Sequence, residues 1–189
     1  AIGDRRTRVL DDEAEFRAAI DSAARECDLI LTSGGVSMGA YDTVKAVLST
    51  LGSVDFIKTA MQPGMPQGCG SVTVDSRTVP IITLPGNPVS SYVSFENFVR
   101  PAIRTMLGAD TIQRPDRMAV MTEGMQSPGS KRQYARGRLD RMQGTVTPVG
   151  GQGSHVVGGL AQANCLIVIN EGVSSVAAGD SVRVIECGE

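Results

Sequence analysis

The chain of 189 residues is long enough for one large domain or two small ones, and its 41% hydrophobic and 20% charged residues are typical of a globular protein. A net charge of −2, the absence of tryptophan and an aromatic content of 4% argue against a nucleic-acid partner, which needs basic charge and stacking side chains. The four cysteines are too scattered for a structural zinc site, so we expect reduced thiols and a cytoplasmic protein. Because neither a signal-peptide pattern nor an apolar run of about 18 residues occurs, we expect no membrane span.

The first part of the chain predicts a helix, a strand, a glycine-rich loop and a second helix. A helix is expected over residues 11–26, where apolar side chains recur at helical spacing behind an acidic first turn. Residues 28–32 form a short apolar run typical of a buried strand, and residues 42–51 resume the helical pattern. This order is typical of an α/β fold with a parallel sheet.

The middle of the chain predicts more strands and a long helix. Three strands are expected, each bounded by turn residues: 54–62, 71–75 and 79–84, the last two joined at Ser76-Arg77. A helix should run from about Pro88 to Leu107, with Asn87 as its N-cap and a kink or break at Pro101.

Beyond a linker over residues 108–115, the composition changes to short segments rich in valine and isoleucine between glycine-rich turns. The segments are residues 117–122, 132–141, 145–149, 165–169 and 181–186. They predict a small β barrel or sandwich of about five strands. We therefore expect an α/β domain over residues 1–109 and an all-β domain over residues 116–189.

The first candidate site is the loop Ser33-Gly34-Gly35-Val36-Ser37-Met38-Gly39, followed by Asp42. It joins a predicted strand to a predicted helix, and ligands of open α/β sheets bind at that edge. Glycines let backbone N–H groups approach an anion, and the helix N-terminus adds favourable potential. A lone carboxylate there suits a divalent cation between Asp42 and a phosphate. The alternative is a tight turn with Asp42 as the N-cap of the next helix.

A second strand-to-helix loop contains Pro85, Gly86, Asn87, Pro88 and Ser90. It should lie at the same edge and could hold another anionic group. Alternatively, its residues only begin the following helix.

Two further segments are weaker candidates. Lys58 precedes a loop with two prolines and two glycines over residues 62–68, and it is either a phosphate partner or a solvated lysine. On a strand, Arg132, Tyr134, Arg136 and Arg138 would share one face, which either reaches an anion or forms local salt bridges. His155 is the only histidine, and no nucleophile–base pair is evident. The residues by themselves predict anion-binding loops and specify no reaction.

Taken together, these motifs resemble the molybdopterin molybdenumtransferases, which are the MoeA proteins and the E domain of gephyrin. The matching α/β segments are Ser33-Gly34-Gly35-Val36-Ser37-x-Gly39-x-x-Asp42, Pro63-Gly64-x-Pro66 and Leu84-Pro85-Gly86-Asn87-Pro88-Val89-Ser90. The matching β segments include Arg132-Gln133-Tyr134-x-Arg136-Gly137 and Gln152-Gly153-Ser154. The resemblance implies a partial three-layer, parallel-sheet pterin-binding domain of the MogA type, followed by a small β barrel.

The resemblance also implies a reaction, namely insertion of molybdate into adenylylated molybdopterin with release of AMP and assistance from Mg²⁺. It implies that Gly34, Gly35 and Ser37 cradle a phosphate and that Asp42 acts through the metal or on the pterin. Pro85, Gly86, Asn87 and Pro88 would shape the pterin and molybdate pocket, with Lys58 and Ser90 as further substrate-binding residues.

The sequence departs from the family pattern in two ways. Family members often carry basic residues beside the Pro-Gly of the third loop, where this chain has Gln62 and Met65. They are also about twice as long, open the α/β domain with a Thr-Gly-Asp-Glu strand, and complete the site across a homodimer. We therefore expect this chain alone to be weakly active or inactive.

Two other functions are kept as alternatives. A scaffold module could bind a pterin or anchor a receptor without catalysis. An adenylyltransferase or competence-damage relative would carry only the α/β domain, and the β region argues against it.

Overall fold

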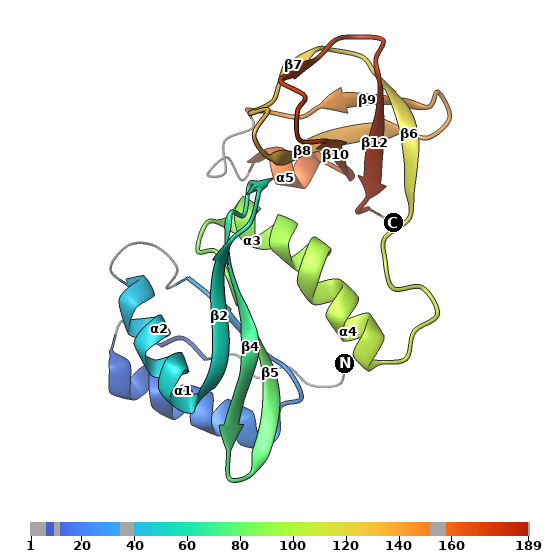
Figure 1. Cartoon of the computed structure of the whole chain (residues 1–189). Coiled ribbons are helices and arrows are strands. Elements are labelled where there is room, and N and C mark those ends of the chain that lie inside the picture. The colour runs from blue at the N-terminus through green and yellow to red at the C-terminus, as the bar shows by residue number, and fades with distance from the viewer. Residues whose placement is uncertain (1–6, 10–11, 35–39, 152–157, 189) are drawn as a thin grey trace. The chain divides into compact units, whose positions relative to one another are not determined.

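The computed structural model describes residues 7–9, 12–34, 40–151 and 158–188 (Figure 1). The chain folds into two compact units. The first unit comprises Ala1–Thr59 and Pro66–Asn87, and the second comprises Ala60–Met65 and Pro88–Glu189. None of the helices within these described residues is long and apolar enough to cross a membrane.

The first unit is a four-stranded sheet with two helices. Its elements are α1 (Glu13–Glu26), β1 (Ile30–Ser33), α2 (Ala40–Leu51), β2 (Gly52–Lys58), β4 (Pro66–Val74) and β5 (Arg77–Leu84). The strand order is β1-β5-β4-β2. The predicted α/β class is confirmed. Of the four strands of this sheet, β1 and β5 pair in parallel as expected, whereas β5–β4 and β4–β2 are antiparallel, so the sheet is mixed and not parallel throughout.

The antiparallel pairing of β4 and β5 follows from the turn that joins them. The turn consists of Asp75 and Ser76, one residue earlier than the sequence predicts, with φ of 49° and 65°. Two consecutive residues of positive φ are typical of the hairpin turn whose twist matches that of the strands. A two-residue connection leaves no room for the crossover that parallel strands require.

The core of the first unit lies between the sheet and its helices. The side chains of Ile20 and Ala24 from α1 and of Leu48 from α2 pack against Val72 and Ile81 of the sheet. The two helices lie side by side on one face of it (Figure 1). Helix α1 begins where an acidic residue can cap it, because the backbone N–H of Glu15 donates to Asp12 at 2.8 Å.

The second unit contains a closed barrel. The strands of this unit are β3 (Met61–Gln62), β6 (Asp116–Met121), β7 (Met125–Gln126), β8 (Arg132–Asp140), β9 (Thr145–Pro148), β10 (Cys165–Ile169), β11 (Ser175–Val176) and β12 (Ser181–Glu186), of which β7 and β11 form a separate two-stranded sheet. The order β10-β12-β6-β9-β8 closes by pairing of β10 with β8. This confirms the predicted small β barrel. Met121, Val146, Ile167 and Val184 are among the buried side chains of its core.

The second unit also contains the helices α3 (Pro88–Ser94), η1 (Phe95–Val99), α4 (Arg100–Met106) and α5 (Gly158–Gln162). Over the described residues 88–106, no helix break lies at Pro101, because α3, η1 and α4 follow one another without a non-helical residue and α4 continues past the proline to Met106; the irregularity is the π-helical turn η1 just before it. Proline has no N–H to donate to the preceding turn, so the hydrogen-bond ladder is irregular there although the helix continues.

The expectation of one strand over residues 54–62 is wrong. The segment forms β2, which pairs with β4, and the separate β3, which pairs in parallel with β8. The two strands belong to different units, and residues 59–60 separate them. The carbonyl of Ala60 accepts a hydrogen bond from the N–H of Arg132 at 2.9 Å, so the backbone pairs with β8 from this residue onward.

Candidate functional site

The two strand-to-helix loops begin side by side. Strands β1 and β5 are parallel neighbours, and their last residues, Ser33 and Leu84, are partners in the register. The N–H of Gly34 donates to the carbonyl of Leu84 at 3.3 Å. The loops therefore leave the sheet from one point at the carboxyl edge, where open α/β sheets bind ligands.

Glycine is required where the loops touch. A Cβ added to Gly86 would lie 3.2 Å from the Cα of Gly34, tighter than most contacts of a real Cβ atom. Gly34 has a φ of 92°, a left-handed conformation that favours glycine. Both glycines thus leave backbone accessible at the edge of the sheet, which is what an anion-binding loop needs.

Several predicted site residues surround this contact. Ser33 is exposed at the end of β1, Pro85 is buried, and Asn87 is half-buried. Gly35 and Ser37 lie outside the described residues. Because α2 begins at Ala40, Asp42 lies within its first turn and not at the N-cap, which removes the capping alternative. The side chain of Asp42 is outside the described part of the structure.

The sheet register brings Lys58 to the same edge. Phe56 of β2, Gly68 of β4 and Thr83 of β5 lie in one row across the sheet. Lys58 lies two residues beyond Phe56, so β2 ends level with the start of the second loop. The lysine is exposed and ends an edge strand, a placement that suits either a solvated residue or an anion partner.

Pro88 and Ser90 belong to the second unit. Pro88 is the first residue of α3, as predicted for a helix start, and Ser90 is buried within that helix. These positions fit the helix-start alternative for the second loop and leave its anion-binding role as a prediction.

The basic segment of β8 is partly structural. Gln133 and Ala135 point into the barrel, so Arg132, Tyr134 and Arg136 share the outer face as predicted. Arg132 forms an ion pair with Glu171 at 3.2 Å. Arg136 is 1% exposed and donates to the carbonyl of Gly151, and its burial lowers the pKa of its guanidinium.

Lys131 places a positive charge beside Met65, one of the two positions where family members often carry a basic residue and this chain does not. The Nζ atom of Lys131 is 3.6 Å from the Sδ atom of Met65, in the loop that follows β3. Because the backbone of residues 61–62 pairs with that of residues 132–133, the lysine, which directly precedes β8, is held next to this loop. Sequence spacing gave no sign of this contact between residues 66 positions apart.

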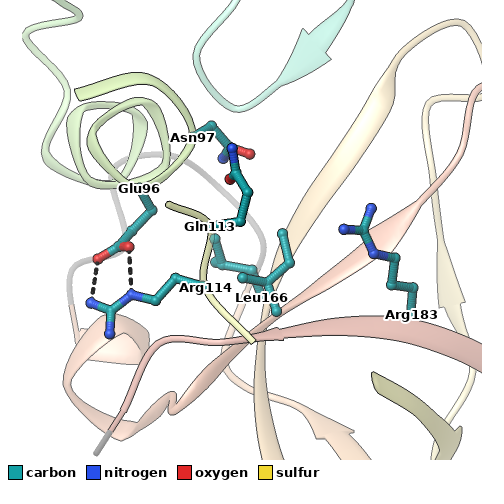
Figure 2. A pocket seen from close by; sticks show the side chains of 7 residues that line it. Glu96, Asn97, Gln113, Arg114, Leu166 and Arg183 are labelled. Atoms are coloured by element: carbon teal, nitrogen blue, oxygen red, sulfur yellow. Dashed lines mark hydrogen bonds and ion pairs between the residues drawn. The ribbon is translucent and has the colours of Figure 1, made fainter. Parts of the chain in front are cut away.

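A pocket in the second unit is lined mainly by paired charges and apolar side chains (Figure 2). Glu96 accepts two hydrogen bonds from Arg114, at 2.9 and 3.0 Å. Arg183 is paired with Asp116, and Leu166 and Ile185 supply apolar surface. Its charged groups already have partners, so we assign the pocket a structural role.

The described residues contain no group of three His, Cys, Asp or Glu side chains that could hold a metal ion. This does not conflict with Mg²⁺, which proteins often bind through one or two carboxylates while substrate phosphates and water complete the shell. Asp42 lies in the first turn of the helix that follows the glycine loop, and its role as a metal ligand remains a prediction.

Two family models match the chain, one over its α/β part and one over its β barrel. A model described as "Probable molybdopterin binding domain" matches residues 4–105, and one described as "MoeA C-terminal region (domain IV)" matches residues 118–187. The chain belongs to the molybdopterin-binding domain family, in its MoeA branch. Its role therefore lies in molybdenum cofactor biosynthesis.

Relatives of this MoeA-type chain carry the same name in several bacteria. Molybdopterin molybdenumtransferase 2 of Mycobacterium tuberculosis is 48% identical over 92% of the chain, and the Haemophilus influenzae molybdopterin molybdenumtransferase is 36% identical over 92%. The chain spans less than half of these relatives, namely 44% and 43% of their length.

Solved structures share the fold of this MoeA-type chain. A molybdopterin biosynthesis MoeA protein of Pyrococcus horikoshii superposes with a TM-score of 0.77 at 27% identity, and covers 95% of the chain and 42% of its own length. A molybdenum cofactor biosynthesis protein of Pyrococcus furiosus gives a TM-score of 0.73 at 26% identity, with 94% and 56% covered.

Proposed function

We propose that this chain binds the phosphate-bearing end of molybdopterin at the carboxyl edge of β1 and β5. We further propose that the protein of which it forms part inserts molybdate into adenylylated molybdopterin and releases AMP. The observation that carries this proposal is the contact between Gly34 and Gly86, which joins two backbone loops at a ligand-binding edge. The names of the relatives support the choice of substrate.

The proposed roles follow from the chemistry of each residue. Gly34, Gly35 and Ser37 would offer N–H and hydroxyl donors to a phosphate, near the favourable N-terminus of α2. Pro85, Gly86, Asn87 and Pro88 would shape the pocket for the pterin and molybdate. Lys58 would contact the substrate from the end of β2, while the expected role of Ser90 is left as a prediction because Ser90 is buried in α3 of the second unit. Donors held in place before the substrate arrives stabilise developing charge without reorganisation during the reaction.

Asp42 would hold Mg²⁺ together with the phosphate oxygens of the substrate. When bound, the ion would offset negative charge on the phosphoanhydride. The residues of the chain would then orient the anhydride toward molybdate and exclude competing geometries.

Three further properties belong to this proposal. The full-length protein is proposed to act as a homodimer, to reside in the cytoplasm, and to need its remaining domains for full activity. Sedimentation of the full-length protein at micromolar concentration tests the dimer, and a monomer under these conditions contradicts it.

Replacing Gly86 with Ala tests the binding site directly. The new Cβ would press against the Gly34 backbone, so we expect affinity for molybdopterin to fall at least tenfold, about the effect of 1.4 kcal/mol. Gly158→Ala is the matched control, because a Cβ there meets nothing within 4 Å. Equal affinity of the Gly86 variant and the wild type would contradict the proposed site. Binding without molybdate insertion by the full-length protein would favour the non-catalytic scaffold.

A further inference from the structure

A pair of threonines lies directly beneath the two loops. Thr32 of β1 and Thr83 of β5 are register partners, so their side chains project from the same face of the sheet. They come one residue before Ser33 and Leu84, with which the strands end. Ile30 and Ile81, one row further into the sheet, belong to the core, so the threonine row separates that core from the loops.

Both hydroxyls are buried, and neither has a hydrogen-bond partner within the described structure. Thr83 is 0% exposed, and the Oγ1 atoms of Thr32 and Thr83 are shielded from solvent. A buried hydroxyl without a partner is costly, whereas valine has the same shape and carries no such cost. Two such hydroxyls in register partners therefore call for a polar ligand that protein atoms do not provide.

Gly68 leaves space next to these hydroxyls. It is the register partner of Thr83 on β4, and a Cβ built on it would lie 2.3 Å from Thr83 Oγ1. It would also lie 3.0 Å from the ring of Phe56 on β2. The missing side chain leaves room for the Thr83 hydroxyl on the side of β5 that faces Gly68.

We propose that Thr32 and Thr83 bind an ordered water molecule beneath the loops and are positioning residues for the Gly34–Gly86 contact. A buried water makes about three hydrogen bonds, of which the two hydroxyls supply two and the backbone of the loops supplies the third. The water thereby ties the ends of β1 and β5 to the segments that receive the phosphate. The inference rests on the proposed function for its effect on substrate, but the water site itself does not.

The test compares isosteric variants in the intact chain. Thr83→Val and Thr32→Val remove a hydroxyl and keep the shape, while Thr83→Ser keeps the hydroxyl. Thr78→Val is the matched control, because Thr73 and Thr78 form an exposed hydroxyl pair 3.0 Å apart on β4 and β5. We expect each valine variant to bind molybdopterin about five- to tenfold more weakly, the effect of one hydrogen bond, and the serine and control variants to bind normally.

Two readouts separate this inference from the proposed function. A crystal structure that resolves water should show density between the two Oγ1 atoms, and an empty site there overturns the inference. A Thr83→Val variant that binds molybdopterin normally and unfolds at higher urea concentration also overturns it, because the hydroxyl was then only an unsatisfied group. If the wild-type chain fails to bind molybdopterin while the water is present, the proposed function fails and the water site stands.

Discussion

Gly68 is placed where a side chain would collide with the threonine row. We expect Gly68→Ala to lower the free energy of unfolding by about 1–3 kcal/mol, because its Cβ would lie 2.3 Å from Thr83 Oγ1. Urea unfolding of the pure protein measures the effect. Adding Thr83→Ala removes the oxygen atom that the new Cβ would clash with. The double variant should therefore lose less unfolding free energy than the sum of the losses in the two single variants. Strict additivity of the two changes would contradict the contact.

Glu96 is a buried carboxylate whose hydrogen-bond partner is Arg114, with Arg100 Nε a further 4.0 Å ion-pair neighbour. It is 7% exposed and accepts both hydrogen bonds of Arg114 (Figure 2). Glu96→Gln leaves the guanidinium with a neutral acceptor, so we expect a loss of about 1.5–3 kcal/mol in unfolding free energy. Asp116→Asn is the control, because its pair with Arg183 is about half exposed and worth at most about 1 kcal/mol. A larger loss from the control than from Glu96→Gln would contradict this ranking.

Strand β12 ends in a carboxylate that links three segments of the barrel. Glu186 accepts hydrogen bonds from Arg141, at 2.6 Å, and from Arg117 of β6, at 2.7 Å. The bond from Arg141 is the main reason why its pKa is lowered from its usual value of about 4.5. A lowered pKa stabilises the fold above the usual value, and this stability is lost as the pH falls through the folded-state pKa.

Acid unfolding should report this carboxylate. We expect the melting temperature of the wild type to fall more steeply below about pH 4.5 than that of Glu186→Gln, which has no charge to lose. At pH 7 the variant should be the less stable protein. Parallel melting curves across the acid range would show that Glu186 contributes nothing to the pH dependence.

Elements with a strong local pattern could be predicted from the sequence, and those that depend on distant partners could not. The barrel strands are visible as alternating apolar runs, whereas Pro101 predicts a break in a helix that in fact continues to Met106. In contrast, β3 is too short for a pattern of its own and exists because β8 lies beside it. The turn at Asp75-Ser76 was predicted one residue late, because two polar residues of positive φ look like any polar turn.

At the scale of the whole molecule, the order of motifs identified the family, but the relations between side chains were not visible. The glycine loops that follow two strands predicted that both loops lie at one edge of the sheet. The register of β1 with β5 places the first residues of the two loops next to each other. The pairing of Thr83 with Thr32 and the contact of Lys131 with Met65 each join segments that lie far apart in the sequence. The only local signal for the buried hydroxyl was that Thr83 is a polar residue within an apolar strand.

The role of Asp42 is best tested in a full-length protein, because this chain spans 44% of its relative from Mycobacterium tuberculosis. We expect Asp42→Asn to slow molybdate insertion by about 10²–10³, the usual effect of removing one positioned electrostatic group. Molybdopterin binding without Mg²⁺ should change little, because without the ion the carboxylate has no metal to hold. Asp55→Asn is the control, since Asp55 is exposed on the edge strand β2. Unchanged insertion by the Asp42 variant, or an equal loss with and without Mg²⁺, would remove the carboxylate from the metal site.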